Sequence, residues 1–531
     1  MPEFAPFDPQ CAADLAQLSE QPYAVITDLI RFHARQQPQH AALIQGERTL
    51  DYAALDALID RAAAALQRDG LQAGDALAIC AAASIEYVVI FLGGLRAGVA
   101  VAPLAPSSTA ESLLGMAADA GARLFFADAA SAAELAPLAD RLSARLILLD
   151  DTDGGMHWSD WLAPPGAQPA PVAIAPDLPF NIIYSSGTTG APKGIVQSHQ
   201  MRWMHVQRGT ASGYGPQAVT LLSTPLYSNT TLVSFFPTLT LGGAVVLMAK
   251  FEASAYLALA QQHRVTHTML VPVQYRRLLA HPDFDRFDLS AFVMKFCTSA
   301  PFSADLKQQI LQRWPGGLLE YYGMTEGGGT CMLAAHEFPN KLHTVGCPAP
   351  GHDIRLIDDA GNEVAPGELG EVVGHSPAMM NAYHRQPGKT AEAEWHDAAG
   401  KRYIRTGDIG RFDEDGFLTL MDRKKDMIIS GGFNVYPSDL EAVLQQHPAV
   451  QEAAVVGVPS ERWGETPVAF VAARHGTDVQ AADLLDWVNQ RLGKTQRLAA
   501  LELVEALPRS AIGKVLKREL RDTLKASGGV A

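Results

Sequence analysis

The chain is poor in cysteine, and the few cysteines it has do not form the patterns of bonded or metal-binding residues. The 531 residues include five cysteines, an odd number: Cys11, Cys80, Cys297, Cys331 and Cys347. No two of them form a C-x-x-C pair. Scattered cysteines disfavour a disulfide framework and a structural zinc site. They fit a reducing compartment, so we expect a cytoplasmic protein.

An excess of basic charge is also lacking. The formal net charge is -15 at pH 7, which argues against general affinity for nucleic acid but still allows a local basic pocket for an anionic nucleotide. Residues 1–8 have neither a positive region nor an apolar core, so they do not form a secretory signal. The most apolar stretch, 87–106, contains Arg96, glycines and two prolines, which indicates helix, turn and buried strand. We therefore expect no nucleic-acid partner and no membrane span.

The sequence has the pattern of an α/β protein. Its 531 residues exceed the usual size of one domain, so we expect more than one domain. Asp51 can cap a helix in which apolar residues recur at helical spacing as far as Leu66. Asp69-Gly70 is expected to end this helix. Alternating strands and helices follow at 76–81, 84–95, 99–104, 239–248, 253–263, 265–271 and 292–298. This alternation predicts a large α/β domain with a parallel sheet.

Beyond residue 350 the pattern changes to short strands and tight turns. Residues 413–416 predict the turn of a hairpin between strands at 410–412 and 417–420. A charged cluster at 422–426 follows it. The order helix, strand, strand, helix, strand is then expected at 440–444, 450–458, 468–473, 484–492 and 501–504. A small α+β domain is predicted from residue 426.

A run of glycines, hydroxyls and one lysine follows the apolar segment 180–183. It reads Tyr184-Ser185-Ser186-Gly187-Thr188-Thr189-Gly190-Ala191-Pro192-Lys193-Gly194. This composition suits phosphate, because glycine lets backbone N–H groups approach an anion and lysine adds a mobile positive charge. The P-loop motif is absent, since Pro192 replaces its second glycine and Gly194 its hydroxyl. Residues 195–199 predict a second strand, so the loop joins two strands; an ordinary polar turn is the alternative.

Three further clusters carry groups suited to a nucleotide, although each alone also fits a turn or a solvated surface. Tyr321-Tyr322-Gly323-Met324-Thr325-Glu326, followed by three glycines, offers an aromatic face for a base, a hydroxyl for phosphate and a carboxylate for Mg²⁺. Asp408, in Arg405-Thr406-Gly407-Asp408, could accept both hydroxyls of a ribose. Lys514 ends Leu507-Pro508-Arg509-Ser510-Ala511-Ile512-Gly513-Lys514, on a predicted loop before a helix at 515–525.

Together, and in this order, these segments resemble the adenylate-forming superfamily of acyl-CoA synthetases, nonribosomal-peptide adenylation domains and beetle luciferases. The resemblance spans nearly the whole chain and rests on four motifs, 185–194, 322–326, 406–408 and 508–514, joined by the charged cluster. It implies a large N-terminal α/β domain with stacked sheets and a β-barrel-like subdomain at residues 1–422. A hinge at 423–425, containing Lys425, and a small mobile C-terminal α+β domain at 426–531 would follow.

The resemblance also implies how ATP and Mg²⁺ are bound. Thr188, Thr189 and Lys193 would close on the β- and γ-phosphates, in a loop with Ser185, Ser186, Gly187 and Gly190. Tyr322, within Tyr321 to Met324, would stack on adenine near Ser299-Ala300-Pro301. Thr325 would contact the α-phosphate, Glu326 would hold Mg²⁺, and Asp408 with Arg423 would take the ribose hydroxyls. A carboxylate then attacks the α-phosphorus, pyrophosphate leaves, and Lys514 bridges the carboxylate and phosphate oxygens.

For the second half-reaction the resemblance implies a rotation of the small domain. Lys514 would leave the site, and Ser430-Gly431-Gly432-Phe433 would line a tunnel for the thiol of coenzyme A, which expels AMP. Trp463 resembles a tryptophan that stacks on the CoA adenine in chlorobenzoate-type ligases. A buried core tryptophan is the alternative for this residue.

Two departures from the family pattern concern the acid and the thiol. A histidine often follows Pro-Leu-Phe in family ligases, whereas this chain reads Pro225-Leu226-Tyr227-Ser228. The usual aromatic-Lys-x-Pro before the final strand is replaced by Thr495-Gln496-Arg497-Leu498, which removes a lysine suited to the CoA phosphates. We therefore expect the acid specificity and the binding of CoA to differ from those of typical family ligases.

The expected acid pocket consists of small and polar residues with few bulky side chains, namely Tyr227, Asn229, Thr230, Ser234, Thr298, Ser299, Gly323, Gly327 and Met332. An aromatic, alicyclic or medium-length acid would fit it. Residues 224–236 contain no acidic side chain for an α-ammonium group, which disfavours an amino acid. His263 to His267 lacks the H-E-x-x-H motif and predicts a helix-to-strand junction.

The leading hypothesis is an AMP-forming acyl-CoA synthetase that uses ATP, Mg²⁺ and CoA. One alternative is an adenylating enzyme that loads the phosphopantetheine of a carrier protein. Another is a catalytically idle relative that senses adenylates, although the lysines of the motifs argue against it. The sequence leaves open a homodimer and does not name the acid.

Overall fold

The structure is a computed structural model that describes residues 20–150, 155–185, 193–423, 426–430, 433–460, 463–493, 496–510 and 513–526. Its contacts divide the chain into two compact units. The first unit contains Met1–Leu342, Ala349–Asp353 and His375–Ile404, and the second contains His343–Pro348, Ile354–Gly374 and Arg405–Ala531. The predicted boundaries at 422 and 426 stay a prediction.

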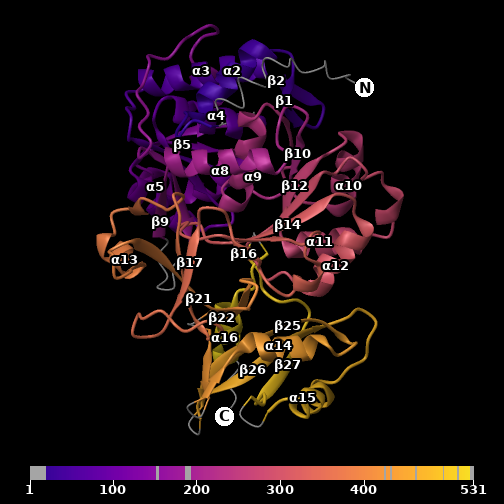
Figure 1. The fold of residues 1–531 in the computed structure, drawn as a ribbon. Helices are drawn as coiled ribbons and strands as arrows, with labels where there is room; N and C mark the ends of the chain where they lie inside the picture. Colours follow the sequence, from indigo (N-terminus) through magenta and orange to yellow (C-terminus); the bar gives the residue numbers. More distant parts are fainter. Residues whose placement is uncertain are drawn as a thin grey trace. The chain divides into compact units, whose positions relative to one another are not determined.

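One sheet of the first unit is parallel except at one edge (Figure 1). Its strands, in spatial order, are β19 (Ala382–Tyr383), β9 (Lys193–Ser198), β8 (Pro179–Ser185), β4 (Ala100–Leu104), β3 (Ala76–Cys80), β5 (Ala122–Ala127), β6 (Arg145–Leu148) and β7 (Met156–His157). β9 is antiparallel to β8, and β19 is antiparallel to β9. β3 and β4 are buried along their whole length, as expected for parallel strands covered on both faces.

A second sheet of this unit is also mostly parallel. The strands that it takes from the first unit are, in spatial order, β15 (Cys331–Ala334), β14 (Gly317–Tyr322), β13 (Met294–Cys297), β12 (His267–Leu270), β10 (Val219–Leu222), β11 (Ala244–Leu247), β1 (Ala41–Gln45) and β2 (Arg48–Asp51). Among these strands, the pairs β14–β15 and β1–β2 are antiparallel and the other pairs are parallel. The predicted junction at His263 to His267 is confirmed, because the preceding helix ends at Gln262 and β12 begins at His267.

Helices cover both sheets. They are α2 (Ile26–Gln36), α3 (Tyr52–Arg68), α4 (Ile85–Arg96), α5 (Ala110–Ala120), α6 (Ala129–Leu135), α7 (Trp158–Trp161), α8 (His199–Ala211), α9 (Asn229–Thr240), α10 (Ala253–Gln262), α11 (Pro272–Leu279), α12 (Ala304–Arg313) and α13 (Pro387–Glu392). Residues of α2, α3, α4, α8 and α9 join residues of both sheets in one buried apolar cluster. Asp51 caps α3 as predicted, since its side chain accepts a hydrogen bond from the backbone N–H of Ala54 at 2.8 Å.

The predicted strand at 239–248 is wrong in its first part. α9 continues to Thr240, and β11 begins only at Ala244. The hydroxyl of Thr240 donates to the carbonyl of Phe236 at 2.6 Å, and Gly242 turns the chain with a φ of +91°. The apolar run continues through helix, turn and strand, so its composition could not show where the helix ends.

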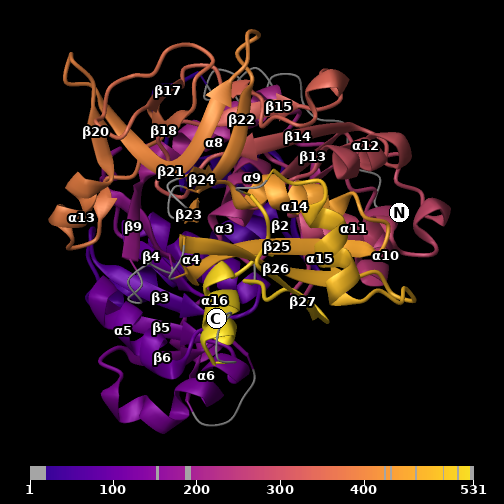
Figure 2. The same cartoon turned by 90° about the horizontal axis from the view of Figure 1, so that it is seen from below.

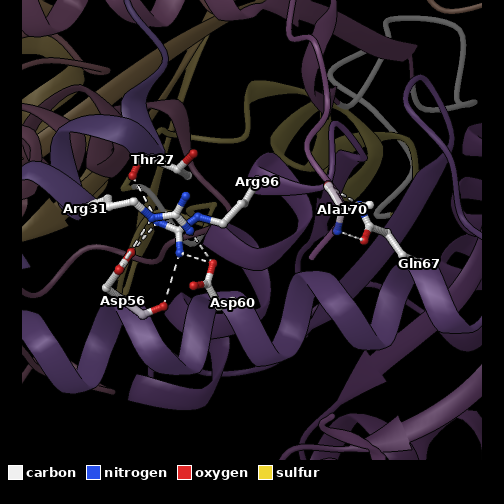
Figure 3. Close-up of polar contacts among 7 residues, drawn as sticks. All are labelled: Thr27, Arg31, Asp56, Asp60, Gln67, Arg96 and Ala170. Atoms are coloured by element: carbon white, nitrogen blue, oxygen red, sulfur yellow. Dashed lines mark hydrogen bonds and ion pairs between the residues drawn. The ribbon is translucent and has the colours of Figure 1, made fainter. Parts of the chain in front are cut away.

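Arg96, which argued against a membrane span, ties three helices together (Figure 3). From the end of α4 it bonds to Asp56 at 2.6 Å and Asp60 at 2.8 Å, both on α3, and to the carbonyl of Thr27 on α2 at 3.0 Å. Arg31 of α2 pairs with the same two carboxylates. The side chains of Arg96 and Asp60 are each only 5% exposed, so this is a buried ionic cluster.

The second unit contains a further small sheet. β21 (Arg402–Phe412) lies between β18 (Gly370–His375) and β22 (Leu418–Arg423), and β17 (Asp353–Ile357) pairs with β18. β20 (Glu394–His396) pairs with the first residues of β21, which belong to the first unit. The predicted hairpin is confirmed, because Gly410 pairs with Leu420 and Phe412 with Leu418. The predicted barrel-like subdomain stays a prediction.

The rest of the second unit is a sheet with helices on both faces (Figure 2). Its elements are β23 (Ile428–Ser430), β24 (Phe433–Val435), α14 (Pro437–Gln445), β25 (Val450–Ser460), β26 (Gly464–Ala473), α15 (Ala481–Asn489), β27 (Ala500–Val504) and α16 (Lys517–Ala526). α14 and α15 pack on one face, around Leu440, Leu484 and Val455. α16 packs on the other, where Leu520 and Leu524 meet Val456 and Phe470. The predicted order of elements is confirmed.

Over the ranges that the structure describes, none of the helices has both the length and the apolar content needed to cross a bilayer.

Candidate active site

The glycine-rich loop connects two neighbouring antiparallel strands, as the sequence predicts. β8 ends at Ser185 and β9 begins at Lys193, and these two residues are partners in the sheet register. The loop residues Ser186, Gly187, Thr188, Thr189 and Gly190 lie outside the described residues. The sheet therefore places Ser185 and Lys193 opposite each other on neighbouring strands.

Lys193 and Glu326 meet through Tyr383, a residue that sequence reasoning missed. The ammonium group of Lys193 lies 5.0 Å from the centre of the Tyr383 ring, and the Tyr383 hydroxyl donates to Oε1 of Glu326 at 2.8 Å. Burial, with the Glu326 charge, raises the pKa of the Tyr383 hydroxyl, so it stays a proton donor. Tyr383 reaches this position because β19 pairs with β9, with Tyr383 opposite Ile195. No local sequence signal marks it, since it is 57 residues from Glu326.

A buried polar network ties Thr325 to the strands of the loop. The side-chain amide of Gln197, on β9, donates to the carbonyl of Thr325 at 2.6 Å and lies 3.4 Å from Oδ1 of Asn229. Asn181, on β8, donates to Oε1 of Gln197 at 3.0 Å. Asn181 and Gln197 are fully buried and each follows an apolar residue in its strand, and a polar side chain in such a place is the signal that could have identified them.

Arg202 of α8 completes this network without a carboxylate. Its guanidinium donates to Oδ1 of Asn181 at 3.1 and 3.2 Å and to Oε1 of Gln197. The side chain is fully buried, and burial lowers its pKa to about 9. The network therefore fixes the backbone at Thr325 with neutral acceptors and one buried cation.

The backbone that follows β14 is packed tightly against residues 378–380. Tyr321 and Tyr322 end the strand, and Gly323, Met324, Thr325 and Glu326 follow it. The backbone N–H of Met380 donates to the Glu326 carbonyl at 2.8 Å. Gly327 has a φ of +76°, and a Cβ there would lie 2.0 Å from the carbonyl oxygen of Ala378. Only glycine fits at this position.

Two residues of the expected acid pocket, Thr230 and Ser299, are hydrogen-bonded to each other. The hydroxyls of Thr230 on α9 and Ser299 after β13 lie 2.5 Å apart. Ser299 has a φ of +80°, a strained value for a residue other than glycine. Ser234 lies 2.7 Å from the Tyr214 hydroxyl, and Met332 is the register partner of Tyr321.

The remaining predicted residues of the first unit lie close to these in the chain. Thr298, Ala300 and Pro301 belong to the loop of Ser299. Tyr227 precedes α9, and Asn229 is its first residue. Burial raises the pKa of the Tyr227 hydroxyl.

Two candidate groups lie in the second unit. Asp408 on β21 is the register partner of Arg423 at the end of β22, although the Arg423 side chain lies outside the described residues. Lys514 is hydrogen-bonded to Ser510: the backbone N–H of Ser510 donates to the Lys514 carbonyl at 2.8 Å, and the backbone N–H of Lys514 donates to the Ser510 hydroxyl at 3.2 Å. Arg509 donates to the Gly513 carbonyl, next to Lys514, at 2.6 Å and to Glu452 at 2.7 Å.

The residues expected at the hinge and the thiol tunnel are only partly covered by the structure. Lys425, Gly431 and Gly432 and the side chain of Phe433 lie outside the described residues. Trp463 is described and is 47% exposed. The alternative of a buried core tryptophan is therefore wrong, and Trp463 is accessible to a ligand.

These features of fold and site agree with the comparison to known families. The model of the AMP-binding enzyme family matches residues 30–384, and that of the AMP-binding enzyme C-terminal domain matches residues 439–514. The chain belongs to the AMP-binding enzymes, and it is an adenylate-forming ligase whose relatives include acyl-CoA ligases.

Three relatives illustrate the similarity. The fatty acid–[acyl-carrier-protein] ligase ScoC of Streptomyces coeruleorubidus is 33% identical over 92% of this chain and 95% of its own. The feruloyl-CoA synthase of an Amycolatopsis species is 33% identical over 92% of this chain and 96% of its own. The crystal structure of ATP-bound MatB from Rhodopseudomonas palustris has a TM-score of 0.84, with 29% identity, and covers 94% of this chain and 99% of that one.

Proposed function

We propose that the protein is an AMP-forming acyl-CoA synthetase. It would activate an aromatic, alicyclic or medium-chain carboxylic acid with ATP and transfer the acyl group to CoA. It would thus be an acid–thiol ligase of fatty-acid or aromatic-acid metabolism and would act in the cytoplasm. The observation that carries the proposal is the contact of Lys193 and Glu326 with one tyrosine, Tyr383. Two groups of opposite charge, both suited to a metal-bound polyphosphate, are thereby held close together.

In the first half-reaction an oxygen of the acid attacks the α-phosphorus of ATP, and the bond to the bridging oxygen of pyrophosphate breaks. Lys193, with Ser185 and the glycine-rich loop, neutralises the leaving pyrophosphate. Thr325, fixed through Gln197, contacts the α-phosphate. Tyr322 stacks on adenine, Asp408 with Arg423 binds the ribose, and Lys514 brings the two anions together.

Glu326 fits the role of Mg²⁺ ligand. Tyr383 donates to Oε1 of the Glu326 carboxylate, while Oε2 has no hydrogen-bond partner in the part of the chain that the structure covers. Mg²⁺ commonly binds one or two carboxylates together with substrate phosphates, so a single carboxylate suffices. The ion would neutralise charge on the phosphates, and Tyr383 orients the carboxylate that holds it.

In the second half-reaction the C-terminal domain rotates about Lys425. The CoA thiolate attacks the acyl carbon and AMP leaves, with residues 430–433 lining the thiol path. The exposed Trp463 suits stacking on the CoA adenine, because it offers an aromatic face to the solvent.

A carrier-protein phosphopantetheine is the second candidate acceptor. It is favoured by the similarity to ScoC, whose name specifies an acyl-carrier-protein substrate, and by Gln496, which stands where relatives place a lysine suited to the CoA phosphates.

The test has two stages. First, a panel of aryl, alicyclic and fatty acids is screened for acid-dependent exchange between pyrophosphate and ATP. Exchange with any acid supports adenylation, and its absence with all of them would refute it in favour of an adenylate sensor. Second, the best acid is supplied with free CoA or with a phosphopantetheinyl carrier protein, and thioester formation identifies the acceptor.

A further inference from the structure

Arg202 is a fully buried cation, and its partners among the described residues are all uncharged. Its guanidinium donates to Oδ1 of Asn181 and to Oε1 of Gln197, and its Nη1 lies 3.5 Å from Nδ1 of His205. Burial, with the charges of Arg208 and Arg202, holds the pKa of His205 well below its usual value, so the His205 ring is neutral. The positive charge of Arg202 is therefore surrounded by neutral acceptors.

A buried charge of this kind is costly, because it leaves water without gaining a countercharge. Arg96 is similarly buried, at 7% exposed, yet it pairs with the carboxylates of Asp56 and Asp60. Arg202 has no carboxylate partner in the part of the chain covered by the structure. With a pKa of about 9 its guanidinium is still charged near pH 7. The charge therefore calls for a role beyond packing.

Arg202 orients the side-chain amide of Gln197. Oε1 of Gln197 accepts hydrogen bonds from Arg202 and, at 3.0 Å, from Asn181. Nε2 of Gln197 points away from the cation and donates to the Thr325 carbonyl at 2.6 Å. In this orientation the positive end of the amide dipole faces Thr325. Hydrogen bonds that follow one another in such a chain polarise and strengthen each other.

The peptide group between Thr325 and Glu326 continues the chain. The backbone N–H of Gly327 donates to the Met324 carbonyl at 3.0 Å, so residues 324–327 form a β-turn with this peptide group at its centre. The peptide bond is trans, and a trans peptide group directs its C=O and its N–H in opposite directions. Because the Thr325 carbonyl faces Gln197, the N–H of Glu326 points away from Gln197. No acceptor for this N–H lies among the residues that the structure describes.

We propose that Arg202 assists adenylation through this chain of amides. Its charge polarises the Gln197 amide and then the Thr325–Glu326 peptide group, so that the N–H of Glu326 is a strengthened donor to an α-phosphate oxygen of ATP. Arg202 and Gln197 are thus positioning residues, and this inference rests on the proposed function. The uncharged partners of Arg202 follow from the same role, because a carboxylate beside it would cancel the potential that the chain transmits.

The test cancels the charge of Arg202 while its partner keeps its shape. Asn181→Asp retains the oxygen that accepts from Arg202 and adds a negative charge. With an acid that supports pyrophosphate exchange in the wild-type protein, kcat for exchange should fall about 5- to 30-fold. The free energy of urea unfolding should stay at or above the wild-type value, because the buried cation gains a countercharge. A purely structural role would make activity and stability fall together.

Two further variants separate charge from hydrogen bonding. Gln197→Glu cancels the charge and also removes the N–H donor to Thr325, so it should slow exchange at least as much as Asn181→Asp. Arg202→Lys keeps the charge and should retain more activity than Asn181→Asp. Gln67→Glu is the matched control, since the Gln67 amide donates to the Ala170 carbonyl at 2.9 Å in an exposed hydrogen bond (Figure 3). It should change exchange less than about threefold.

Three results would each overturn the inference. They are exchange by Asn181→Asp within about threefold of the wild-type rate, a loss of stability in Asn181→Asp together with its activity, and slower exchange by Arg202→Lys than by Asn181→Asp. All three are observed against a wild-type protein that is active. Absence of exchange with every acid in the wild-type protein would instead refute the proposed function.

Discussion

Tyr383 joins Lys193 and Glu326 through two different parts of its side chain, so the parts can be tested separately. Tyr383→Phe keeps the ring beneath Lys193 and removes only the hydroxyl that donates to Glu326. We expect the Mg²⁺ concentration that half-saturates pyrophosphate exchange to rise about 3- to 10-fold, since one hydrogen bond to a charged group is lost. Tyr403→Phe is the matched control, because it removes a similar bond, from Tyr403 to Asp353. An unchanged Mg²⁺ requirement in Tyr383→Phe would argue against the assigned role of Glu326.

His33 gives the fold a defined response to acid. Its Nε2 lies 3.0 Å from the Thr240 carbonyl, and its Nδ1 lies 3.3 Å from the side-chain amide of Gln37, so the neutral ring satisfies both partners. Burial lowers the pKa of His33 from 6.5 to about 4. As the pH falls, His33 is therefore protonated in the unfolded chain at a higher pH than in the folded protein. The contribution of His33 to the free energy of unfolding is fully present above pH 6.5 and declines towards pH 4.

The measurement is the free energy of urea unfolding between pH 7 and pH 4. His33→Gln should lower stability near pH 7 and also flatten the dependence on pH by up to about 1.4 kcal/mol per pH unit. The exposed His396→Gln is the control. Parallel pH curves for His33→Gln and the wild-type protein would contradict this explanation.

At the scale of elements, the contact among α2, α3 and α4 depends on the ionic cluster around Arg96. Arg96→Met would leave Asp56 and Asp60 with Arg31 as their remaining partner in a buried setting. Removing one member of a buried charged group typically costs about 3–5 kcal/mol, and we expect a loss of this size in urea unfolding. Arg286→Met breaks an ion pair whose arginine side chain is 82% exposed and should cost less than about 1 kcal/mol. Equal losses in the two variants would show that burial is not the cause.

Elements whose ends are marked by local chemistry could be predicted from the sequence. The cap at Asp51 and the strands on either side of the glycine-rich loop are examples. The boundary between α9 and β11 could not, since the apolar run there is continuous. Contacts within the site were also beyond prediction, because Gln197 and Thr325 are 128 residues apart and meet only when the sheet has formed.

For the whole molecule, the proposed alternation of the C-terminal domain predicts that the two half-reactions can be separated. Lys514→Ala should slow adenylation about 10²- to 10³-fold, the usual effect of deleting one electrostatic stabiliser. It should retain much of the thioester step when acyl-AMP is supplied with CoA. Arg518→Ala, which removes an exposed charge from the neighbouring helix, should leave both steps intact. Equal loss of both steps in Lys514→Ala would contradict the rotation.

The path of the chain at Gly327 also has a consequence for redesigning the enzyme. Any side chain at this position would collide with the Ala378 carbonyl, 2.0 Å from the added carbon. A mutant library aimed at new acids should therefore keep residue 327 constant and vary Ser234 and Met332. Variation would then be confined to positions where the backbone tolerates a change, and a larger share of the library should fold.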